Sequence, residues 1–138
     1  MAKKKKKKKA GAALATFTVT VAPGNIVPAG SNNVECDFNG PTVTDNALFL
    51  SLNTAYDITF NLEDGTEYTF DPAKPFCNKK MRCPPELPKG SVQKPFTVTT
   101  KDSDSIKVHV APVPSRKVTH FRLNFNDGYS CDPIIINN

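Results

Sequence analysis

Hydrophobic and polar residues alternate with a period of two along most of this chain. Between Phe17 and Val21 the apolar side chains occupy every second position, with threonines between them. Because successive side chains of a β-strand point to opposite faces, this alternation predicts strands that bury one face. It recurs in Val34/Cys36/Phe38, Leu48/Leu50/Leu52, Tyr56/Ile58/Phe60/Leu62, Tyr68/Phe70, Phe96/Val98, Ile106/Val108/Val110 and Phe121/Leu123/Phe125. The pattern predicts about eight short strands, and no window shows the apolar spacing of a helix.

Short polar turns separate several of these segments. Asp64-Gly65 lies between Leu62 and Thr66, and both positions of the dipeptide tolerate the positive φ angles of a two-residue type I′ turn. We therefore expect a β-hairpin at this dipeptide. Asp127-Gly128 repeats the device, and Asp102-Ser103-Asp104 is expected to join two further strands. Regularly spaced short strands with such turns predict an all-β fold, an antiparallel β-sandwich of about eight strands.

Residues 71–93 interrupt the alternation. The segment contains the prolines Pro72, Pro75, Pro84, Pro85 and Pro88. Proline lacks a backbone N–H and is excluded from central strands. The composition therefore predicts a long Pro-rich surface loop. Such loops are often functional, and an insertion without a role of its own is the alternative.

Lysines open the chain in an unbroken run: Lys3, Lys4, Lys5, Lys6, Lys7, Lys8 and Lys9. The run sets the net charge of +5, because the rest of the chain carries eleven Lys and Arg against thirteen Asp and Glu, a difference of −2. Like charges cannot bury or pair with one another, so residues 1–15 are expected to form a disordered arm with an Ala/Gly linker. Residues 16–138 are long enough for one domain with a real core. A signal-peptide n-region, a tag and an aid to solubility are alternative interpretations of the lysines.

Four cysteines, Cys36, Cys77, Cys83 and Cys131, form an even set in a small β-rich chain, which favours two disulfides in an oxidising compartment. Cys36 and Cys131 fall on the buried phase of their segments, so we expect them to pair and to join the first and last strands. Cys77 and Cys83 would then close a short loop. Zinc is less well supported, because its ligands usually come in pairs about two to four residues apart. Buried free thiols in a cytosolic protein are the second alternative.

Catalytic and metal-binding motifs are scarce. His109 and His120 both fall on the polar phase of their strands, and no Ser, Cys or carboxylate can be tied to either one by sequence. Residues 102–105 alternate oxygen-bearing side chains as a calcium loop does, but they lack the glycine and the closing glutamate of an EF-hand. No Gly-rich phosphate loop or dinucleotide fingerprint is present. The sequence therefore predicts no cofactor and no metal, and an enzyme is the least favoured class.

Polyanions are the partners that the lysines fit. The loop cations Lys79, Lys80 and Arg82 would present a second basic patch. Flexible lysines contact a phosphate backbone and read no bases, so nucleic acid would be bound without sequence preference. An anionic bilayer is electrostatically possible, but the longest apolar strings, such as Ile134–Ile136, are far shorter than the roughly 20 residues of a membrane span.

The C-terminal residues 126–138, with Asp132-Pro133-Ile134-Ile135 at their centre, resemble the ending of the DP-EP family, small bacterial all-β proteins that close in a similar Asp-Pro-x-Ile segment. The resemblance extends to residues 96–107 and to the opening strand at 16–21, about half the chain. It implies an immunoglobulin-like sandwich and no established activity, and it carries no site residues over. The lysine arm, the four cysteines and the Pro-rich loop depart from the family pattern.

Together these observations predict a non-catalytic binding or structural β-sandwich that acts outside the reducing cytosol, in the periplasm, outside the cell or in a virion. The rival hypothesis is a virion or nucleoid protein whose lysine arm neutralises nucleic acid. The edges of a sandwich also make a homo-oligomer physically available. An enzyme is the remaining alternative.

Overall fold

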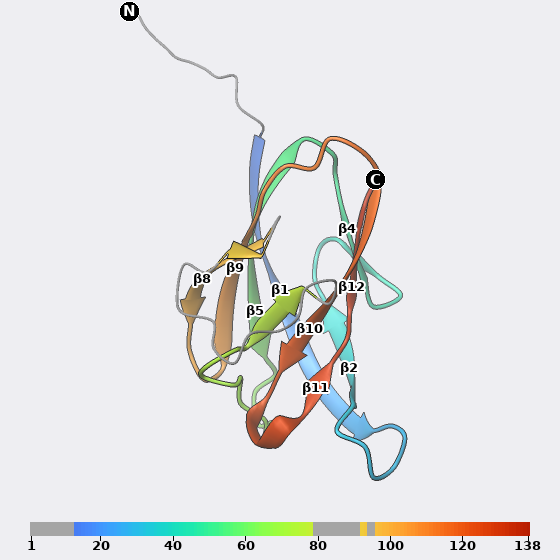
Figure 1. Ribbon diagram of the computed structural model, residues 1–138, viewed down its shortest axis with the longest axis vertical. Helices are drawn as coiled ribbons and strands as arrows, with labels where there is room; N and C mark the ends of the chain where they lie inside the picture. Colours follow the sequence, from blue (N-terminus) through green and yellow to red (C-terminus); the bar gives the residue numbers. More distant parts are fainter. Residues whose placement is uncertain (1–12, 79–91, 94–95) are drawn as a thin grey trace, which may run out of the picture.

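A computed structural model describes residues 13–78, 92–93 and 96–138; residues 1–12, 79–91 and 94–95 lie outside the described part (Figure 1). The described residues form two β-sheets that pack face to face, so the predicted sandwich is confirmed. Their strands are β1 (Ala13–Ile26), β2 (Val34–Asn39), β3 (Val43–Thr44), β4 (Ala47–Leu50), β5 (Thr54–Leu62), β6 (Phe76–Asn78), β7 (Val92–Gln93), β8 (Phe96–Lys101), β9 (Ser105–Val110), β10 (Lys117–Asn124), β11 (Ser130–Cys131) and β12 (Ile134–Asn137).

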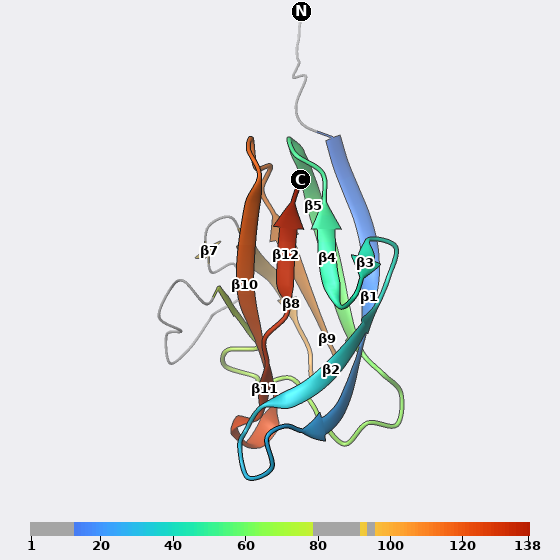
Figure 2. The same ribbon diagram turned by 90° about the vertical axis from the view of Figure 1, so that its right-hand side faces the viewer.

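The first sheet has the strand order β2-β1-β5-β9-β8-β7, and the second has the order β11-β10-β12-β4-β3, with β6 paired to β10. Figures 1 and 2 show the two layers from directions 90° apart. Most neighbours are antiparallel, but β1 runs parallel to β5 and β12 runs parallel to β4. These two parallel pairs are exceptions within the predicted antiparallel sandwich, and they join strands too distant in sequence for a hairpin.

Large aromatic side chains fill the space between the sheets. Phe60 of β5 faces Phe121 of β10 across the interior, with ring centroids 5.7 Å apart. Phe76 stacks on Phe121 at 5.1 Å and meets Phe96 edge-on at 5.2 Å. All four side chains are at most 1% exposed. One aromatic cluster therefore joins both sheets into a single core, as the alternating sequence predicts.

The hairpin predicted at Asp64-Gly65 is wrong. Gly65 does take a positive φ of 84°, and the amide of Thr66 donates to the carbonyl of Glu63 at 3.3 Å. However, no strand returns beside β5, because β5 is central and is already paired with β1 on one side and β9 on the other. Tyr68 and Phe70 consequently form no strand, and Phe70 makes only an isolated bridge to Phe125.

The turn at Asp127-Gly128 is confirmed. Asp127 has φ 60° and Gly128 has φ 79°, so both central residues adopt the left-handed conformation that the type I′ turn requires. β11 and β12 then pair with β10 in one uninterrupted register, from Leu123↔Cys131 to Lys117↔Asn137. They are two parts of one strand, divided at Pro133, which cannot donate a hydrogen bond.

The Pro-rich segment is only partly a surface loop. Its first residues enter the fold as β6, which pairs with β10, and both Phe76 and Cys77 are fully buried. β6 lies at the edge of its sheet, where the neighbouring prolines are tolerated. The remainder of the predicted loop, residues 79–91, lies outside the described part.

β1 begins at Ala13, so the last residues assigned to the linker are already strand. The N-terminal end of β1 lies at one end of the sandwich, and the turn between β10 and β11 lies at the other (Figure 1). Within the described ranges, no helix has the length and apolar character needed to cross a membrane.

Candidate functional site

The two sheets meet along a seam between β2 and β11. Asn33, directly before β2, forms a parallel bridge with Ser130, and the Ser130 amide donates to the carbonyl of Asn32 at 2.9 Å. β2 belongs to the first sheet and β11 to the second. The seam therefore brings residues that are almost 100 positions apart into contact by backbone hydrogen bonding. Figure 2 shows β2 and β11 next to each other in the lower half of the view.

Cys36 and Cys131 lie side by side on this seam. Both are free thiols, 7% and 3% exposed, and they are hydrogen-bonded to each other. This hydrogen bond, followed by burial, raises the pKa of the Cys131 thiol far above its ordinary value. Both side chains point inward, as their phase in the sequence predicts. Cys36 lies on β2, the second strand rather than the predicted first, and Cys131 lies on β11, the first part of the strand that β12 completes.

A groove of about 340 Å³ adjoins the thiol pair. Its lining is Asn33, Val34, Glu35, Cys36, Phe38, Asn46, Cys131, Asp132 and Pro133. Asn46 is fixed beside it by accepting a hydrogen bond from the Phe38 amide at 2.9 Å, and it adopts a positive φ of 59°. The groove combines two sulfur atoms with amide and carboxylate groups, so a small polar thiol or disulfide could enter it. We call this region the thiol groove.

Cys77 is disulfide-bonded. Cys83, the partner that the sequence predicts for it, lies outside the described residues, as do Lys79, Lys80 and Arg82. The run Lys3 to Lys9 is outside as well. The roles of the two basic segments therefore stay predictions.

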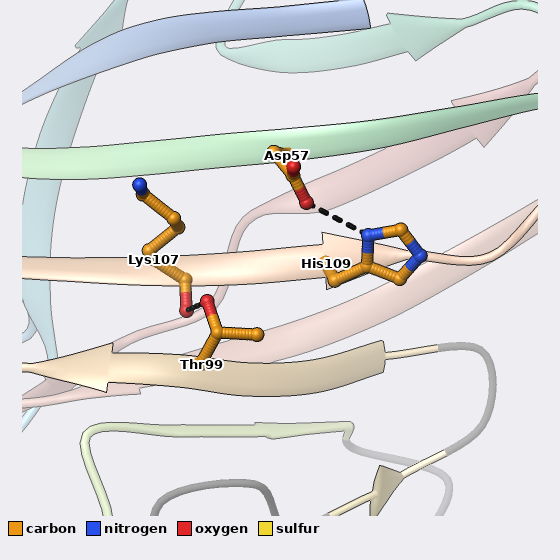
Figure 3. Close-up of polar contacts among 4 residues, drawn as sticks. All are labelled: Asp57, Thr99, Lys107 and His109. Atoms are coloured by element: carbon orange, nitrogen blue, oxygen red, sulfur yellow. Dashed lines mark hydrogen bonds and ion pairs between the residues drawn. The ribbon is translucent and has the colours of Figure 1, made fainter. Parts of the chain in front are cut away.

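His109 has a carboxylate partner that the sequence did not suggest. Its Nδ1 lies 2.7 Å from Oδ1 of Asp57, which stands directly opposite on the neighbouring strand β5 (Figure 3). The two residues are 52 positions apart, and only the pairing of β5 with β9 brings them together. Nearby, the Thr99 hydroxyl donates to the carbonyl of Lys107 at 3.3 Å. A His–Asp pair could hold an imidazole proton, and this one lies on the outer face of the first sheet, where both side chains are partly exposed.

The other candidates from the sequence are His120 and the Asp102-Ser103-Asp104 turn. His120 is exposed, as expected for its phase. In the Asp102-Ser103-Asp104 turn, the carbonyl of Ser103 accepts a hydrogen bond from the Phe70 amide at 2.7 Å, and that of Asp104 accepts one from the Leu62 amide at 2.8 Å. This turn therefore connects β8 to β9 and closes the end of the core. In the part of the chain that the structure describes, no group of three or more His, Cys, Asp or Glu side chains could hold a metal ion.

A second pocket, of about 420 Å³, was not foreseen from sequence. Tyr68 and Tyr129 line it and meet edge-on, with ring centroids 5.7 Å apart. Burial, then the neighbouring Tyr129 and Glu67, raises the pKa of Tyr68. Tyr68 is the residue assigned to a strand by alternation, and its placement in a loop explains why no local pattern identified the pocket.

Comparison with known proteins finds no matching family and no similar curated protein. The resemblance to the DP-EP family therefore stays a hypothesis that rests on the quoted residues alone.

Proposed function

We propose that this protein is a non-catalytic structural or binding β-sandwich whose lysine arm contacts polyanions without sequence preference. The single observation that supports it is the segregation of charge between the sandwich and the rest of the chain. The described residues contain six Lys and Arg but twelve Asp and Glu, a net −6. The other twelve of the eighteen basic residues lie in residues 1–12 and 79–95. Contact with a polyanion would have to be led by these segments, because the sandwich itself repels it.

The start of β1 limits how far the lysines can be from the fold. Lys9 precedes Ala13 by four positions, so an extended chain would span roughly 14 Å between them. β1, which begins at Ala13, starts at the end of the sandwich opposite the β10–β11 turn (Figure 1). A polyanion held by Lys9 would thus lie within reach of the end of the sandwich where β1 begins.

The cysteines support a location outside the reducing cytosol. Disulfides persist in oxidising compartments, and Cys77 is disulfide-bonded. This supports the periplasm, the extracellular space or a virion as the place of action.

The test is retardation of an arbitrary DNA duplex by the full chain at several salt concentrations. If all seven lysines contact phosphate, the logarithm of the affinity should fall with the logarithm of salt with a slope of about −6. A variant with glutamine at these positions, from Lys3→Gln through Lys9→Gln, should lose retardation, since its net charge falls from +5 to −2.

Two controls make the result specific. Arginine at the same seven positions should retain binding, because charge and not lysine chemistry is required. Glutamine in place of Lys79, Lys80 and Arg82 should leave most of the salt slope intact. Retardation that survives the loss of all seven arm charges, or that is insensitive to salt, would contradict the proposal.

A further inference from the structure

The thiol groove suggests a property beyond polyanion binding. Cys36 and Cys131 belong to different sheets, and they touch only because the seam pairs Asn33 with Ser130. A covalent bond between them would tie together the edges of the two layers. The Cys77 disulfide is a separate element, at the opposite side of β10 from β11.

Cys36 and Cys131 are both free and buried, and both line the same groove. Two buried thiols that hydrogen-bond to each other need little movement to form a disulfide. The disulfide is uncharged, so it suits this buried site, where a pair of thiolates would not.

The groove gives a reagent access to the sulfurs. It holds about 340 Å³ and contains both cysteines together with the polar side chains of Asn33, Glu35 and Asp132. Glu35 and Asp132 are exposed, so they lie at the solvent side of the groove while the sulfurs lie deeper. Amide and carboxylate groups can hydrogen-bond to the amino and amide groups of a small peptide disulfide such as oxidised glutathione.

We propose that Cys36 and Cys131 are a redox-active pair that closes reversibly into an inter-sheet disulfide by exchange with a small-molecule disulfide. Cys36, the more exposed of the two, loses its proton and attacks one sulfur of the reagent, which releases one thiol. Cys131 then attacks Cys36 in the mixed disulfide and releases the second thiol. Two protons and two electrons pass to the reagent, so that two protein thiols and one small disulfide become one protein disulfide and two small thiols.

The experiment incubates the full native chain in buffers of defined oxidised and reduced glutathione ratio. Free thiols are then alkylated and the protein is analysed by mass spectrometry under non-reducing conditions. The expected result is a two-thiol form at reducing ratios and a form with no free thiol at oxidising ratios, with a Cys36–Cys131 cross-linked peptide. Closure should also raise the thermal midpoint by roughly 10 °C, because the loop closed is long.

Single substitutions identify the attacking residue. Cys131→Ser should accumulate one glutathione adduct on Cys36, whereas Cys36→Ser should react much more slowly. The double variant Cys77→Ser/Cys83→Ser is the matched control, and its Cys36–Cys131 closure should be unchanged. Deleting the lysine arm should also leave closure unchanged, so failure of the polyanion proposal and failure of this one are distinguishable.

Two results would overturn the inference. One is a wild-type chain whose two thiols stay freely alkylatable after prolonged exposure to oxidised glutathione. The other is a cross-link that joins Cys36 or Cys131 to Cys77 or Cys83. If a serine variant fails to fold, the number of free thiols counted in the wild-type protein still tests the proposal.

Discussion

The outer faces of the two sheets differ in chemistry, although their inner faces are alike. Across the first sheet, one outward row contains Thr16, Asp57, His109 and Thr97, and the next contains Thr18, Thr59 and Lys107. Every side chain in these rows is polar or charged. The His109–Asp57 pair lies in the first of them (Figure 3).

The outer face of the second sheet carries an apolar row. Val118 of β10, Ile136 of β12 and Phe49 of β4 stand directly beside one another, and Val118 and Phe49 are 37% and 40% exposed. Ile134 follows on the same side of β12 and is half-buried. We call these four residues the apolar row.

This difference teaches that alternation specifies which face of a strand is buried but not what covers the other face. The first sheet needs no cover, because its outward side chains are solvated. The second sheet instead leaves apolar side chains of its outer face partly in contact with solvent. A polar substitution in the apolar row should therefore lower the surface hydrophobicity, and an apolar substitution on the outer face of the first sheet should raise it. Truncations on the inner face of either sheet should both lower the free energy of unfolding.

The largest expected effect comes from breaking the shared core. Phe60 and Phe121 belong to different sheets and contact each other with no exposure to solvent. Phe60→Ala and Phe121→Ala should each lower the free energy of unfolding by about 3–5 kcal/mol, because each removes a large buried ring and leaves a cavity. Urea unfolding measures the change.

Thr18→Ala on the outer face is the matched control, with an expected change within about 0.5 kcal/mol. A loss below about 1 kcal/mol for either phenylalanine would show that the two sheets do not share one cooperative core.

The residues of the core could be predicted from the sequence. Odd-even alternation identified the inward residues of β1, β2, β5, β8, β9 and β10, because a strand with one buried face must alternate. The Asp127-Gly128 turn was also recoverable, since its two positive-φ residues and its short loop are purely local features.

The pairing of distant strands was not within reach. The dipeptide Asp64-Gly65 has the chemistry of a hairpin turn, but whether a hairpin forms depends on a free side of β5, which β1 and β9 occupy. The Asp57–His109 pair depends on the same kind of long-range register. Cys36 and Cys131 are the exception, because their even number and their shared buried phase already predicted that they lie together. Local patterns predict which face of a strand a residue occupies. The side chains of a site come together only when strands that are distant in sequence pair, and local patterns do not predict that pairing.

A smaller effect is expected from the apolar row. Phe49→Thr should lower the free energy of unfolding by only about 1 kcal/mol, because Phe49 is already 40% exposed to solvent. It should clearly reduce retention on a hydrophobic-interaction column. Thr59→Val on the first sheet is the reciprocal change and should increase retention. Equal retention of the wild type and both variants would mean that the two outer faces do not differ as described.

The smallest effect is expected from two partly exposed side-chain pairs of the described residues, His109 with Asp57 on the first sheet and Arg122 with Asp132 on the second. His109 and Asp57 are 38% and 30% exposed, and Arg122 and Asp132 of the second sheet are 39% and 31% exposed, with a separation of 3.1 Å. Double-mutant cycles with His109→Gln/Asp57→Asn and Arg122→Gln/Asp132→Asn should each give a coupling of about 0.2–1 kcal/mol that weakens with added salt. Matched exposure should make the couplings similar, although one lies on the polar face and the other near the apolar row. A coupling above about 2 kcal/mol for His109 alone would mean that this pair is held more strongly than exposed charges are, and would make the polar face the better candidate for chemistry.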